Sequence, residues 1–235
     1  MRLARALHAE WTKLRTVPAT ACLPPATVVA TAALGTAVST SCGGDCDAAR
    51  LSLSGVYLGQ LAVVALAVLA AAGEYRHGLA ATTLMAVPAR LVAFTAKALA
   101  VTAAVLPAAA LAVAASLAAS RAPLPPGPSL RAGGGTVVYL VLVALLALGV
   151  AATIRRTAPA LSTVLGLLYM APIAAQFVTD DRWRTLIERA TPAPAALAIQ
   201  DTTDPAHPWS GLAVLAAWTA AALTAGATAF IRRDG

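Results

Sequence analysis

Residues 132–154 read AGGGTVVYLVLVALLALGVAATI, and after Arg155 and Arg156 a second uncharged run, residues 157–179, reads TAPALSTVLGLLYMAPIAAQFVT. An α-helix needs about 20 predominantly apolar residues to cross the hydrocarbon core of a bilayer, and both runs are long enough. Because only the two arginines separate them, the runs predict an antiparallel pair of membrane-spanning helices.

The rest of the chain has the same character. Of its 235 residues, 59% are hydrophobic and 11% are charged, with a mean hydropathy of +0.77, whereas a soluble domain carries about 25% charged residues. The sequence therefore predicts an all-α integral membrane protein, one domain over residues 1–235 with six transmembrane helices. We expect these spans at about 18–39, 53–73, 94–118, 135–154, 157–179 and 210–230.

Prolines and glycines modify this picture. Pro24 and Pro25 predict that the first span is kinked or starts late, and Pro107 predicts an interruption of the third. Residues 122–135 are rich in both residue types, which is typical of a flexible connection. In the long outer segment 180–208 we expect two short interfacial or re-entrant helices.

Residues 2–16 predict an amphipathic helix that precedes the spans. At 100° per residue its large apolar side chains share one side, and most of its polar side chains lie off that stripe. A basic polar face with a tryptophan on the apolar side suits a helix lying in the membrane interface. The stripe consists of Leu3, Leu7, Trp11 and Leu14.

The distribution of basic residues predicts the orientation. Eleven of the 17 lie at the two termini and in the second and fourth connections, so the positive-inside rule places both termini in the cytoplasm of a multi-pass protein of the cell membrane. The net charge of +7 then indicates attraction to anionic membrane lipid rather than to nucleic acid, because no water-facing basic module exists.

The spans lack the groups that transporters use to hold protons or metals. Lys97 is the only ionisable residue near a predicted span interior, and we expect it to reach toward the interface. No P-loop is present, because the glycines at 133–135 have no lysine after them. The sequence therefore predicts no enzyme, no bound cofactor or metal and no self-powered transport. The larger polar side chains of the spans are Gln60, Gln176, Tyr57, Tyr139 and Tyr169.

Two connections carry residues of interest. Cys42 and Cys46, in CGGDC in the first outer loop, could form a local disulfide, and they are too few for a structural zinc site. The cytoplasmic segment 73–98 is open to two interpretations: a solvated loop that obeys the positive-inside rule, or a short docking helix with an exposed Leu/Met/Thr face.

Several motifs together resemble those of actinobacterial permeases of the type-two ATP-binding-cassette (ABC) exporter class. They are AEWTKLRT at 9–16, GEYRHG at 73–78, and Thr83-Leu84, Val87-Pro88, Arg90 and Ala96-Lys97-Ala98 after the second span. The resemblance implies a transmembrane subunit that pairs with a second permease copy, as a homodimer or heterodimer, and with a separate ATPase subunit that hydrolyses ATP.

The resemblance also implies roles for particular segments. Residues 2–16 would form the interfacial elbow helix, and the loop 74–92 would couple the permease to the ATPase. A non-transporting immunity or signalling subunit is the alternative, and a membrane enzyme is disfavoured by the lack of a catalytic constellation. The coupling contact would involve Glu74, Tyr75, Arg76, Gly78, Thr83, Leu84, Pro88 and Arg90.

Overall fold

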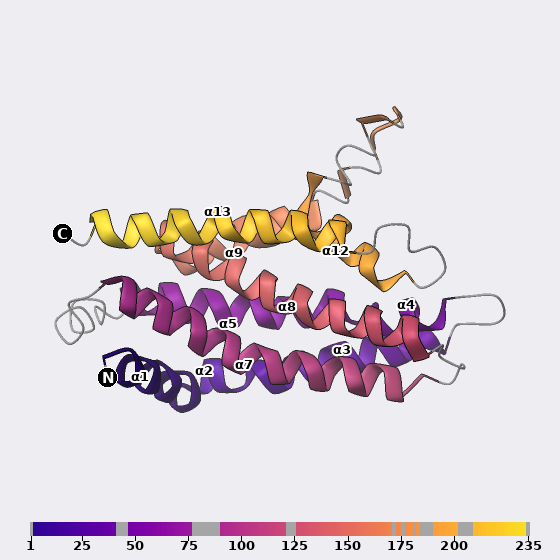
Figure 1. Cartoon of the computed structure of the whole chain (residues 1–235), viewed down its shortest axis with the longest axis horizontal. Helices are drawn as coiled ribbons and strands as arrows, with labels where there is room; N and C mark the ends of the chain where they lie inside the picture. Colours follow the sequence, from indigo (N-terminus) through magenta and orange to yellow (C-terminus); the bar gives the residue numbers. More distant parts are fainter. Residues whose placement is uncertain are drawn as a thin grey trace.

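The structure is a computed structural model that describes residues 2–40, 47–76, 90–120, 126–170, 173–174, 177–180, 182–183, 190–201 and 209–233. The regular structure of these residues is helical, and the long helices run along the longest axis of the molecule (Figure 1). The helices are α1 (Arg2–Thr16), α2 (Pro18–Ala21), α3 (Leu23–Ser39), α4 (Ala48–Leu53), α5 (Val56–Arg76), α7 (Arg90–Ala118), α8 (Pro126–Ile154), α9 (Thr157–Leu165), the π-helix η1 (Gly166–Met170), α12 (Pro192–Leu197), the 3-10 helix η2 (Ala198–Gln200) and α13 (Ser210–Arg233).

Five helical segments are long and apolar enough to cross a membrane, which indicates a multi-pass membrane protein. Five of the six predicted spans are therefore confirmed as helices of sufficient length. The remaining one, expected over 157–179, is described as the shorter apolar helix Thr157–Met170, so its crossing stays a prediction. The five segments are Pro18–Ser39, Ala49–Gly73, Leu91–Ala118, Gly127–Ile154 and Ser210–Ile231.

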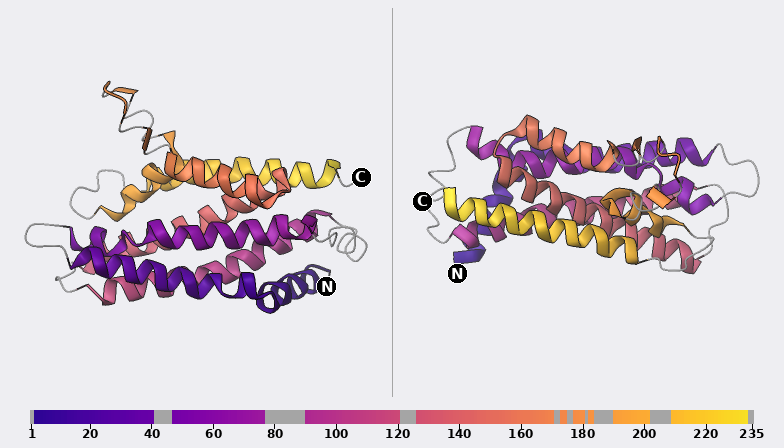
Figure 2. Two further views of the ribbon diagram at one scale, coloured as in Figure 1. Left: turned by 180° about the vertical axis from the view of Figure 1, so that it is seen from behind. Right: turned by 90° about the horizontal axis from the view of Figure 1, so that it is seen from above.

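Both ends of the chain lie at the same end of the bundle, called here the proximal end (Figures 1 and 2). Helix α5 ends there, and α7 begins there. The turn between α8 and α9 also lies there, since the Arg155 side chain in that turn donates a hydrogen bond of 3.0 Å to the carbonyl of Ala229 near the end of α13. The α8–α9 hairpin predicted from the sequence is confirmed. That the proximal end faces the cytoplasm stays a prediction.

The sequence predicts a flexible connection over residues 122–135. This prediction is wrong for residues 126–135, because they form the first turns of α8. Pro126 and Pro128 fit there because the first N–H groups of a helix need no intrahelical acceptor. Gly135 fits because a methyl group at its Cα would lie only 2.2 Å from Cγ1 of Ile199. The glycine therefore permits close packing rather than flexibility.

The proline predictions for the first and third spans have opposite outcomes. Helix α3 starts late, at Leu23, with Pro24 and Pro25 in its first turn, as predicted. The interruption expected at Pro107 is wrong, because α7 continues through it. Proline removes one backbone hydrogen bond from α7, and packing against α3 and α8 keeps the helix intact.

Small residues bring the helices close together. A methyl group on Gly55, in the turn between α4 and α5, would lie 1.9 Å from the carbonyl oxygen of Thr31 on α3. A methyl group on Gly149 of α8 would lie 2.5 Å from the carbonyl of Ala222 on α13. Helices in lipid associate by such close contacts, because the hydrophobic effect does not drive apolar helices together there. These glycines set the spacing of the bundle.

Candidate functional site

A buried ion pair joins α1 to the proximal part of α7. Nζ of Lys97 lies 2.7 Å from Oε2 of Glu10, and the two side chains are only 7% and 9% exposed. The Lys97 ammonium also donates to the carbonyl of Ala70 on α5 at 3.0 Å. Lys13, which is 40% exposed, holds the other carboxylate oxygen at 2.8 Å. This cluster of Glu10, Lys13, Lys97 and the Ala70 carbonyl is called the proximal charge cluster.

The expectation that Lys97 reaches toward the interface stays a prediction. The side chain is buried and ends at Glu10 of α1, and its ammonium has a carboxylate and a carbonyl within hydrogen-bond distance. Among the residues whose side chains the structure describes, Glu10 and Lys97 are the buried charged ones. Buried charges are retained in proteins when they are paired in this way.

The carboxyl group of Glu10 is ionised in this setting. Burial by itself raises the pKa of a carboxyl group, but the charge of Lys97 and the hydrogen bonds from Lys13 and Lys97 outweigh burial, so the pKa of Glu10 lies below its usual value of 4.5. The Glu10 side chain is therefore a carboxylate at neutral pH.

This ionisation predicts a pH dependence of stability. Because the pKa of Glu10 is lower in the folded than in the unfolded chain, the pair's contribution is complete above about 4.5 and is lost as the pH falls through the folded value. The reference is the double variant Glu10→Met/Lys97→Met, which lacks the pair. Between about pH 6 and pH 3 we expect the unfolding temperature of the wild type, followed by circular dichroism, to fall relative to the reference. If the difference in unfolding temperature between the wild type and the reference stayed constant over this pH range, an ionised Glu10 would be contradicted.

The face of α1 that packs on the bundle is rotated from the predicted apolar stripe. Ala6, Glu10 and Leu14 are buried, at 6%, 7% and 8% exposure, and they follow one another at helical spacing. Leu7 packs against the core, whereas Leu3 is 43% exposed. Residues 2–16 form helix α1 in the structure, and its amphipathic, interfacial character stays a prediction.

The proximal charge cluster joins the two helices between which the predicted coupling loop lies in the sequence. Ala70 is near the end of α5 and Lys97 near the start of α7, so Glu10 links α1 to both helices that flank residues 77–89. The predicted contact residues are only partly described. Four of them belong to described helices, although the structure does not describe their side chains: Glu74, Tyr75 and Arg76 end α5, and Arg90 starts α7. The other four, Gly78, Thr83, Leu84 and Pro88, lie wholly outside the described residues. The possible disulfide partners Cys42 and Cys46 also lie outside them.

The structure also brings together four of the five larger polar side chains of the spans. The Tyr139 hydroxyl donates to Oε1 of Gln60, and the Tyr169 hydroxyl donates to the backbone carbonyl of Tyr57. Gln60 and Tyr139 are fully buried. This polar cluster connects α5, α8 and η1 inside the bundle, whereas Gln176 lies outside the described residues.

A short segment closes the opposite, distal end of the bundle. In α12 and η2, Ala196 and Ile199 are fully buried, and Gln200 donates to the hydroxyl of Thr136 on α8 at 3.1 Å. Arg131 of α8 donates to the Asp201 carbonyl at 2.8 Å. The second of the two short helices expected in the outer segment is thus confirmed as a helix, while most of the first lies outside the described residues.

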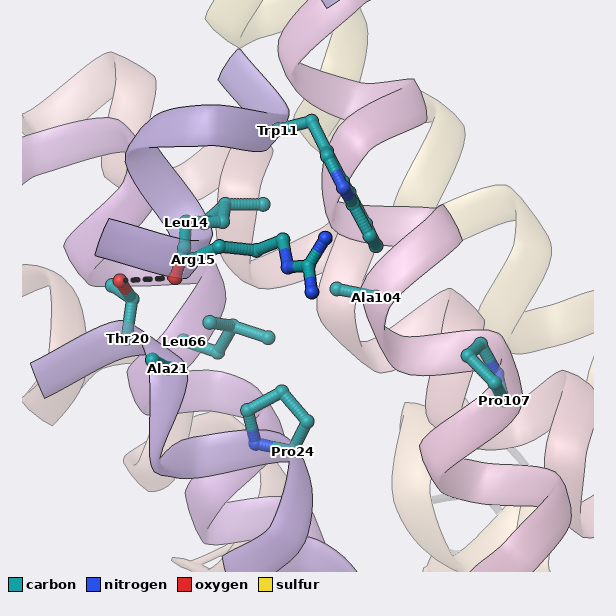
Figure 3. Close-up of a pocket in the computed structure, with 9 residues that line it drawn as sticks. All are labelled: Trp11, Leu14, Arg15, Thr20, Ala21, Pro24, Leu66, Ala104 and Pro107. Atoms are coloured by element: carbon teal, nitrogen blue, oxygen red, sulfur yellow. Dashed lines mark hydrogen bonds between the residues drawn. The ribbon is translucent and has the colours of Figure 1, made fainter. Parts of the chain in front are cut away.

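A cavity of about 240 Å³ adjoins α1 (Figure 3). Its wall is mostly apolar, with Leu14 from α1, Leu66 from α5 and Pro107 from α7. Figure 3 shows the Arg15 guanidinium reaching into this cavity toward Ala104. The Trp11 ring stands beside it, with its centre 6.0 Å from the guanidinium carbon. The cavity thus combines an apolar wall with one cation.

No protein-family model matches the sequence, and no curated protein matches it either.

Proposed function

We propose that the chain is the membrane-spanning subunit of an ABC exporter, which moves a substrate across the cell membrane with energy from a separate ATPase subunit. Three observations support the proposal. Five helices have the length and apolarity of membrane spans. The two termini, the end of α5 and the start of α7 lie at one end of the bundle. The buried charges of the described residues are used in an ion pair between helices.

The proximal charge cluster is the observation that carries the proposal. It connects α1 to the end of α5 and the start of α7, and these two helices flank the loop 77–89. A partner that binds this loop would therefore move three helices together rather than one. A permease without its own ATPase motif requires such a connection between helices, because a partner subunit must supply the energy for transport.

In this proposal the proximal end faces the cytoplasm, and the residues 74–92 contact the ATPase through Tyr75, Leu84 and their neighbours. The substrate pathway forms with a second permease copy, either identical or a sister chain. Substrate would meet an apolar, alanine-rich interior, with the hydroxyl and amide groups of the polar cluster as its polar features.

The contact with the ATPase is tested by co-purification. We expect the variant Tyr75→Asp/Leu84→Asp to lose the ABC ATPase encoded beside it, because carboxylates replace apolar side chains in a docking surface. The control is Leu130→Asp, which places one such carboxylate on a side chain that is 75% exposed at the distal end. Equal recovery of the ATPase with the wild type and the double variant would contradict the coupling assignment.

The same components give a second readout for this prediction. In proteoliposomes, addition of the wild-type chain should change the turnover of the ATPase, and the double variant should leave it unchanged. If the wild type also leaves turnover unchanged, the chain is a non-transporting membrane subunit.

A further inference from the structure

We propose that the cavity beside α1 binds an anionic phospholipid of the leaflet at the proximal end, with the lipid phosphate at Arg15 and an acyl chain along the apolar wall. This inference does not depend on the exporter proposal, because it requires only that the bundle lies in a membrane.

The first argument is the charge of Arg15. Its neighbour Lys13 is paired with Glu10, whereas among the residues whose side chains the structure describes no carboxylate pairs with Arg15. Its guanidinium lies beside the Trp11 ring and points into the cavity (Figure 3). A guanidinium binds phosphate through two parallel hydrogen bonds, so a phosphate group at the cavity mouth would supply the missing anion.

The second argument is the depth and lining of the cavity. Ala104, toward which Arg15 points, lies seven residues beyond Lys97 and therefore about 10 Å further along α7. Leu66, which also lines the cavity, belongs to the buried core. The cavity thus extends from the charged end of the bundle into its membrane-spanning part. A ligand with a charged head and an apolar tail matches this gradient.

The third argument is a second cavity that shares Trp11 with the first. It has a volume of about 350 Å³ and is lined by Leu7, His8 and Ala103, together with Trp11 itself. The tryptophan therefore borders two largely apolar hollows on neighbouring parts of α1 and α7, and Arg15 lines the first of them. Two hollows that share a wall suit a phospholipid, which carries two acyl chains on one phosphate.

A free phosphate ion is a poorer match. It would give up its hydration at a site where Arg15 is the only cation and most of the remaining wall is apolar. The phosphate of a lipid already lies at the membrane interface, and the acyl chains of the same lipid would pack against the apolar wall of the cavity.

Quenching of Trp11 fluorescence by brominated lipid tests the proposal. In a variant with Trp183, Trp209 and Trp218 replaced by phenylalanine, Trp11 is the only tryptophan. We titrate the detergent-solubilised protein with phosphatidylglycerol or phosphatidylcholine whose acyl chains carry bromine. Phosphatidylglycerol should quench at about fivefold lower concentration, the contribution of one arginine near an anionic lipid. Equal quenching by both lipids would overturn the proposal.

Arg15→Gln should remove this preference for phosphatidylglycerol. The matched control is Arg5→Gln, which loses the same charge from an exposed position of α1 that does not line the cavity. An equal loss in both variants would mean attraction by the general surface charge, and would overturn the site.

Two further variants keep the test decisive if Arg15→Gln does not fold. Arg15→Lys should retain most of the preference, and Ala104→Leu, which keeps all charges, should weaken quenching by filling the cavity. Full quenching in Ala104→Leu would exclude an acyl chain there. Inorganic phosphate should leave quenching unchanged, and its displacement of brominated phosphatidylglycerol would show a free-phosphate site instead.

Discussion

Glu10→Met is expected to destabilise the protein by roughly 3 to 5 kcal/mol, the usual cost of removing one partner from a buried ion pair. The substitution removes the carboxylate that lies 2.7 Å from the ammonium of Lys97, whose side chain is only 7% exposed. A buried charge that loses a paired carboxylate keeps the cost of its lost hydration and loses the attraction that offset it. Unfolding of detergent-solubilised protein with increasing sodium dodecyl sulfate measures the loss.

Two controls separate the charge from the packing. In Glu10→Met/Lys97→Met, both charges are replaced by apolar side chains, and most of the lost stability should return, because the desolvation of both ions disappears. In Lys13→Met the partner removed from Glu10 is 40% exposed, so the cost should stay below about 1 kcal/mol. If the double variant is as unstable as Glu10→Met, the packing of Glu10, and not its charge, holds α1.

The existence of the long helices could be predicted from the charges alone. An ionised side chain at mid-bilayer costs about 2.5 to 3.5 kcal/mol, so stretches without Asp, Glu, Lys or Arg mark the spans, and five of them are helices of sufficient length. The start of α8 could not be predicted in this way. Glycine at 135 is usually a loop signal, and its reason for being there is Ile199, which belongs to a distant part of the chain.

The pairing in the proximal charge cluster could not be predicted from the sequence. Lys97 is a lone cation next to a span, and the sequence does not show whether a carboxylate pairs with it, because Glu10 and Glu74 both lie on its predicted side. Choosing Glu10 requires the docking of α1 on α7. At 100° per residue Glu10 lies at the edge of the predicted apolar stripe, about 20° from Leu3, and the row that is buried in the structure is Ala6, Glu10 and Leu14.

The polar cluster was beyond sequence reasoning for a similar reason. Tyr57, Gln60, Tyr139 and Tyr169 come from three segments of the chain, and only the relative register of α5, α8 and η1 brings them together. Register depends on close contacts at individual small residues. A charge pattern that locates spans to within a few residues does not contain this information.

The contact of α8 with α13 shows this dependence most directly, and Gly149→Ala tests it. Alanine favours a helix interior over glycine by about 1 kcal/mol, so the substitution should stabilise α8 by itself. The added methyl group, however, would lie 2.5 Å from the carbonyl carbon and oxygen of Ala222. These are backbone atoms, so α8 and α13 must separate. We expect a net destabilisation of about 1 to 3 kcal/mol, typical of an overpacked contact.

Gly134→Ala is the matched control for this prediction, because it makes the same change in the same helix at an exposed position where nothing lies within 4 Å of the new methyl group. It should be neutral or stabilising in the same titration with sodium dodecyl sulfate. Gly226→Ala, facing Gly149 from α13 with a methyl group 2.8 Å from the Gly149 carbonyl oxygen, should be destabilising too. Because Gly226 and Gly149 share one contact, the double variant should cost less than the two single losses added together. Equal behaviour of Gly149→Ala and Gly134→Ala would show that helix propensity, and not the approach of α13, determines the effect of a methyl group on α8.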